Sequence, residues 1–144
     1  MTMRIDFHSN VPDKLLYACR LVRKARAQAN PERIVLLLPN PMLLAQLDEA
    51  LWSFSDIDFL PHVQANHALA AQTPVLLTCN EAVDCATPPI LINLTRRTLE
   101  QPQRYARVFD LVGSDDEDKL AGRERYRFYQ QQGFTLSHFV ANLQ

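Results

Sequence analysis

Short apolar runs recur along this chain, and they restrict its fold more than any other feature. The segment "RIVLLLP" at 33–39 holds only apolar residues between Arg33 and Pro39. A run of this kind is typical of a strand buried on both faces, as in a parallel sheet covered by helices. Further strands are predicted at 4–8, 75–79, 90–94 and 107–112, with an edge strand at 134–140.

Longer segments with a helical period separate these runs. Residues 11–30 and 41–52 each carry an apolar stripe at the spacing of an amphipathic helix. Ser114 and Glu117 fit the S-x-x-E capping box, which predicts the start of a last helix. The alternation predicts a single α/β domain over 1–144, with a mostly parallel sheet and helices on both faces.

Glycine content argues against a nucleotide site. The three glycines, Gly113, Gly122 and Gly133, all lie in the last third of the 144 residues. A phosphate loop after the first strand needs glycines so that backbone N–H groups can approach the phosphates, and "HSNVPDK" at 8–14 has none. A small nucleotide-dependent enzyme therefore has little support, and no cofactor is expected.

Catalytic and metal-binding groups show no recognisable spacing. Cys19, Cys79 and Cys85 form no CxxC pair, which favours reduced thiols in a cytoplasmic protein. His62 and His67 are five residues apart, which does not place both on one helix face as metal ligands. We assign no catalytic residue and no metal ligand. No apolar segment approaches the ~18 residues of a membrane span, so we expect a soluble protein.

The last predicted helix carries three cations in a column. Lys119, Arg123 and Arg127 stack at i, i+4 and i+8, and we call these three residues the basic ridge. Arg125 adds a further charge to this segment, although the net charge of the chain is −1. Like charges repel one another, so the fold alone gives little reason to place them there.

The basic ridge fits two kinds of ligand. Tyr126 lies three residues from Arg123, on the same side of the helix. An arginine fork beside an apolar notch suits a carboxylate attached to a hydrophobic group, such as the C-terminus of a peptide. Cations beside aromatic rings also suit the phosphates and unpaired bases of a single-stranded nucleic acid. The pattern leaves both possibilities open.

Several segments together resemble the chi subunit of bacterial DNA polymerase III. They are "LDEALW" (47–52), "FLPH" (59–62), "ILINL" (90–94), "VFDLV" (108–112) and "RERYRFYQQQGF" (123–134), in the order and spacing of that family. The resemblance covers nearly the whole chain. It implies a Rossmann-like fold without the nucleotide-binding glycine loop, and a non-catalytic accessory subunit of the clamp loader in DNA replication.

The resemblance also implies two partners. Chi proteins hold the acidic, Phe-ending C-terminal tail of single-stranded DNA-binding protein on one surface, so DNA is reached only indirectly. On a separate surface they pair with the psi subunit, which tethers them to the clamp loader. The alternative is a module that binds single-stranded nucleic acid directly through the basic ridge.

Matching positions supply the residues expected at each surface. Those of the tail site are Lys119, Arg123, Tyr126, Arg127, Trp52 and Val112. The resemblance implies that Arg123 pairs with the terminal carboxylate, and that Lys119 and Arg127 pair with aspartates of the tail. Trp52, Val112 and Tyr126 are expected to enclose the terminal Phe ring. Phe59, Leu60 and Pro61 are expected at the psi contact.

Overall fold

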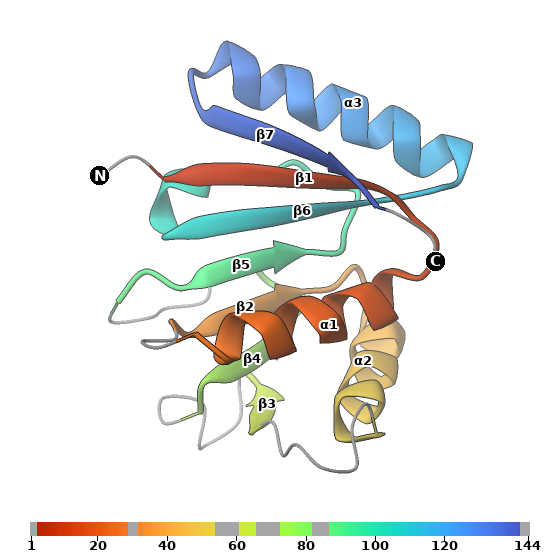
Figure 1. Cartoon of the computed structure of the whole chain (residues 1–144), viewed down its shortest axis with the longest axis vertical. Coiled ribbons are helices and arrows are strands. Elements are labelled where there is room, and N and C mark those ends of the chain that lie inside the picture. The colour runs from red at the N-terminus through yellow and green to blue at the C-terminus, as the bar shows by residue number, and fades with distance from the viewer. Residues whose placement is uncertain (1–2, 29–31, 54–60, 66–72, 82–86, 142–144) are drawn as a thin grey trace.

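A parallel sheet of seven strands organises the part of the chain that the computed structural model describes, which is residues 3–28, 32–53, 61–65, 73–81 and 87–141 (Figure 1). The strand order is β3-β4-β2-β5-β6-β1-β7, and every neighbouring pair is parallel. The strands are β1 (Arg4–Val11), β2 (Ile34–Leu37), β3 (His62–Gln64), β4 (Val75–Thr78), β5 (Ile90–Asn93), β6 (Arg107–Gly113) and β7 (Thr135–Val140). The predicted α/β class is confirmed, and β7 is the edge strand expected at 134–140.

Helices lie on both faces of this sheet (Figure 1). The helices α1 (Lys14–Arg26) and α2 (Pro41–Ser53) cover one face, and α3 (Asp116–Gln131) covers the other. Side chains alternate along a strand, so Ile34 of β2 packs with α1 and α2 while Val35 belongs to the core on the α3 side. A 3-10 turn, Pro102–Arg104, precedes β6.

The start of α3 differs from the capping box predicted from the sequence. Asp115, not Ser114, is the N-cap residue, and its carboxylate accepts a hydrogen bond of 3.2 Å from the backbone N–H of Asp118. Ser114 lies outside the helix and is exposed. The prediction that Ser114 and Glu117 cap each other is therefore wrong, because the neighbouring carboxylate occupies the cap position instead.

The inward face of α3 is unusually polar, because Arg125 lies on it. Arg125 is 1% exposed, and its guanidinium donates to the buried Asp110 of β6, with Nη2 2.7 Å from Oδ1. A second donation joins Arg125 Nη1 to the backbone carbonyl of Arg96 at 3.1 Å. Burial raises the pKa of Asp110 against the opposing effect of this guanidinium. Arg125 therefore does not add to the surface charge beside the basic ridge, as the sequence had suggested.

Candidate functional site

A cavity of about 450 Å³ lies between α3 and the carboxyl-end halves of β1, β6 and β7. This volume is within the roughly 300–1,000 Å³ typical of ligand pockets. The side chains that line it divide into three groups by chemistry. The lining consists of a basic wall (Lys119, Arg123, Arg127), an apolar floor (Phe7, Val112, Gly122, Tyr126) and a polar rim (Ser9, Asn10, His138).

The basic wall is the basic ridge predicted from the sequence. One helical turn separates each of its members from the next, and all three side chains are exposed. Among the described residues, no hydrogen bond or ion pair engages Lys119, Arg123 or Arg127. Their charges are therefore available to an anionic ligand, in contrast to the buried charge of Arg125.

The apolar floor is built by two rings and a close approach of the helix to the sheet. Tyr126 packs edge-on against Phe7 of β1, with ring centroids 5.1 Å apart. A Cβ atom at Gly122 would lie 2.8 Å from Cγ2 of Val112, so only glycine lets α3 lie this near β6. Val112 and Phe7 are themselves 5% and 2% exposed, and they form a rigid base for the cavity.

Sequence reasoning missed the polar rim entirely. Ser9 Oγ and His138 Nε2 are 2.6 Å apart and join the neighbouring strands β1 and β7. Asn10 has a φ of 59° at a point where the pairing of β1 with β6 shifts register. Asparagine tolerates this left-handed conformation better than most residues, and the register shift lies where β1 lines the cavity. Nothing in the sequence pattern brings residues 9, 10 and 138 together.

Asp118 anchors the N-terminal turn of α3, from which the basic ridge extends. Its carboxylate forms an ion pair with Lys14 Nζ at 2.5 Å. It also accepts hydrogen bonds from Arg96 Nε and from the backbone N–H of Gly113, both at 2.6 Å. Burial alone would raise the pKa of Asp118, but the hydrogen bonds from these three donors outweigh it and lower the pKa to about 2. The carboxylate therefore stays ionised and joins α1, β6 and α3.

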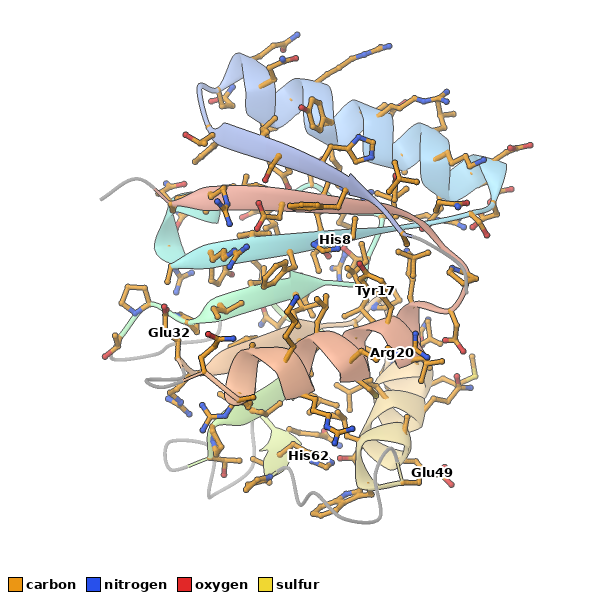
Figure 2. All side chains as sticks on the ribbon, in the orientation of Figure 1. His8, Tyr17, Arg20, Glu32, Glu49 and His62 are labelled. Atoms are coloured by element: carbon orange, nitrogen blue, oxygen red, sulfur yellow. The ribbon has the colours of Figure 1, made fainter. Side chains whose placement is uncertain are left out.

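Trp52 does not line the cavity, which corrects the prediction that it encloses the same slot as Tyr126. It lies at the end of α2, which contacts β3 and β4 at one end of the strand order. Helix α3 contacts β6 and β7, towards the other end of that order. The Trp52 side chain is 51% exposed, and its ring centroid is 4.3 Å from that of His62 (labelled in Figure 2). Position along the chain could not reveal this, because strand order decides which helices are neighbours.

Of the three residues expected at the psi contact, Pro61 alone belongs to the described part of the chain. Phe59 and Leu60 lie outside the described residues. Pro61 is exposed and directly precedes β3, whose first residue, His62, packs against Trp52. Trp52 and Pro61 therefore lie near each other, on the side of the molecule away from the cavity.

The described part of the chain presents neither clustered metal ligands nor a membrane-spanning helix. No group of three or more His, Cys, Asp or Glu side chains there is placed to hold a metal ion. None of the helices described is long and apolar enough to cross a membrane.

Comparison with known proteins gives consistent matches. Residues 1–137 match the family described as DNA polymerase III chi subunit, HolC. A protein of Pseudomonas aeruginosa named DNA polymerase III subunit chi is 32% identical over 142 residues, which covers 92% of this chain and 93% of that protein. The proteins of the same name from Haemophilus influenzae and Escherichia coli are 26% and 28% identical, over 83% and 74% of this chain and 82% and 72% of their own lengths.

Proposed function

The chain belongs to the DNA polymerase III chi subunit family, and on that premise we propose that its cavity binds the acidic C-terminal tail of single-stranded DNA-binding protein. The observation that carries the proposal is the basic ridge, whose three exposed cations flank an apolar floor. A peptide that ends in phenylalanine has the complementary chemistry, because its last residue combines a ring with a carboxylate.

Each part of the tail has a matching group in the cavity. Arg123 is the middle residue of the ridge, and its planar guanidinium can hold the terminal carboxylate through two hydrogen bonds. The terminal ring then rests on Phe7, Val112 and Tyr126. Lys119 and Arg127, one turn to either side, pair with aspartates further along the tail. These exposed charges make the binding sensitive to salt.

We further propose that Trp52 belongs to the surface that pairs with the psi subunit, and not to the tail site. Trp52 is half-exposed and lies beside His62 and Pro61, next to the segment that the family resemblance assigns to psi. Exposed tryptophan side chains are frequent anchors of protein interfaces. The two surfaces are then at opposite sides of the sheet, so one chi chain can hold both partners at once and link the clamp loader to coated template.

The tail proposal is tested by titration with a fluorescent acidic peptide that ends in phenylalanine. Arg123→Glu removes the carboxylate fork and adds repulsion, so we expect affinity to fall by at least about tenfold. A peptide without its final Phe should bind similarly weakly. The matched control is Arg20→Glu, an exposed arginine of α1 on the other face of the sheet, which should bind like the unaltered protein.

Equal peptide affinity of the unaltered protein and Arg123→Glu would remove Arg123 from the proposed site. A psi pull-down with the same variants tests the second surface separately. Trp52→Ala should lose psi and keep the peptide, whereas Arg123→Glu should keep psi and lose the peptide. Loss of both partners in either variant, with an unchanged melting curve, would contradict the separation of the two surfaces.

A further inference from the structure

Part of the sheet is left uncovered by the described helices on the face that α1 and α2 occupy. These two helices cover the region of β2, β4, β5 and part of β6, and no described helix lies in front of β1 and β7 (Figure 1). The strand register shows which side chains share this open face. They are Arg4, Asp6 and His8 of β1, Arg107 and Phe109 of β6, and Ser137 and Phe139 of β7.

An exposed aromatic ring lies on this open face. Phe139 is 50% exposed, and its ring lies over His8 with centroids 5.2 Å apart. His8 is supported in turn by Tyr17 of α1, at 5.4 Å, and by Phe109, at 5.5 Å (His8 and Tyr17 are labelled in Figure 2). The His8 Nδ1 atom also shares a hydrogen bond with the Tyr17 hydroxyl. Phe139 is thus presented to solvent on a base of packed aromatic rings.

Two arginines lie further along the same face of β1 and β6, and the carboxylate between them is already matched. Asp6 is fully buried and pairs with both Arg4 and Arg107, whose side chains remain 47% and 38% exposed. The Arg107 guanidinium also lies 4.5 Å from the centroid of the Phe109 ring. Two arginines against one aspartate leave a positive balance on the open face.

The adjoining helix extends this charge. Burial lowers the pKa of His8, and Arg107 and Lys24 are near enough to lower it further against the effect of Asp6. Lys24 lies two helical turns after Tyr17, on the same face of α1 as the ring that packs on His8, and its side chain is exposed. Helix α1 contains no Asp or Glu between Lys14 and Arg26. Arg107 of β6 therefore borders the aromatic base, and Arg4 of β1 lies with it at Asp6 on the same face.

We propose that this open face binds single-stranded nucleic acid, with a base stacked on Phe139 and the backbone phosphates against Arg107, Arg4 and Lys24. An exposed ring on a bare sheet, bordered by arginine and lysine, is the arrangement that accepts unpaired bases of any sequence. The surface lies on the opposite face of the sheet from α3 and its basic ridge. The contact is therefore independent of the proposed tail site, and it brings the protein onto the template strand directly.

Fluorescence anisotropy with a labelled oligo-dT strand at low salt tests this assignment. The full chain should bind weakly, and affinity should fall as salt rises. Phe139→Ala should weaken binding by about tenfold, as expected for loss of one stacked base. Lys24→Glu, placed on a different element, should weaken it as well. Phe139 is half-exposed on an edge strand, so its truncation leaves the core intact, and circular dichroism melting checks this.

Two matched variants locate the contact. Phe128→Ala removes another exposed ring, 44% exposed on α3, and Arg123→Glu reverses a charge of the basic ridge. Both should bind the oligonucleotide like the unaltered protein. The proposal is overturned if the unaltered chain does not bind the oligonucleotide. It is also overturned if Arg123→Glu loses binding while Phe139→Ala keeps it. A Phe139-dependent dimer in light scattering that binds no oligonucleotide overturns it as well. The peptide titration is a separate measurement, so either proposal can fail without the other.

Discussion

Replacing Asp118 with asparagine should remove one of the strongest single stabilising interactions of the fold. Asp118 is 2% exposed, and its carboxylate accepts hydrogen bonds from Lys14, Arg96 and the Gly113 N–H, which lower its pKa from 3.8 to about 2. At about 1.4 kcal/mol for each pKa unit, this difference corresponds to roughly 2.5 kcal/mol of folding free energy at pH 7. Asparagine keeps the shape of the protonated carboxyl group but carries no charge for Lys14 and Arg96.

The same difference should depend on pH in a defined direction. Because the folded-state pKa lies below the unfolded value, the contribution is complete above about pH 5 and is lost as the pH falls through about 2. The gap between the two proteins should be about half as large near pH 3 as at pH 7. The substituted asparagine does not titrate, so only the unaltered protein contributes this pH dependence.

Urea denaturation at a series of pH values measures the effect, since the slope against urea should be the same for both proteins. Asp116→Asn is the matched control, because this exposed carboxylate of the same first turn interacts mainly with the helix dipole and should contribute no more than about 1 kcal/mol. The reasoning is refuted if Asp118→Asn costs no more than this control, or if its cost at pH 3 equals that at pH 7.

Two further substitutions test the packing of α3 against the sheet, both by urea unfolding. Gly122→Ala should destabilise the protein by up to about 2 kcal/mol, because overlap with Val112 outweighs the gain in helix propensity. When Gly122→Ala is combined with Val112→Ala, the loss of unfolding free energy should be smaller than the sum of the two single losses. A Gly122→Ala variant that is more stable than the unaltered protein would contradict the close approach. Arg125→Met should cost about 3–5 kcal/mol by leaving the Asp110 charge buried and unpaired. Adding Asp110→Asn should recover part of that loss, and strict additivity would contradict the pairing.

Features that depend on spacing along one element could be predicted from the sequence. Unbroken apolar runs predicted buried parallel strands, because a strand covered on both faces has no solvent side for polar residues. The column of Lys119, Arg123 and Arg127 followed from the helical repeat alone. The inward stripe of α3, namely Asp118, Gly122, Arg125 and Tyr129, has the same kind of spacing, so the burial of Arg125 could have been recognised from the pattern.

Contacts between elements could be learned only from the folded chain. The cavity needs Ser9 and Asn10 of β1 beside His138 of β7, and the open face needs Phe139 over His8; these pairs lie far apart in the sequence and are joined by strand order and register. The same order carries Trp52 to the other side of the sheet. Periodicity describes one element at a time, whereas contacts between elements depend on how all strands pair, and no local pattern contains that information.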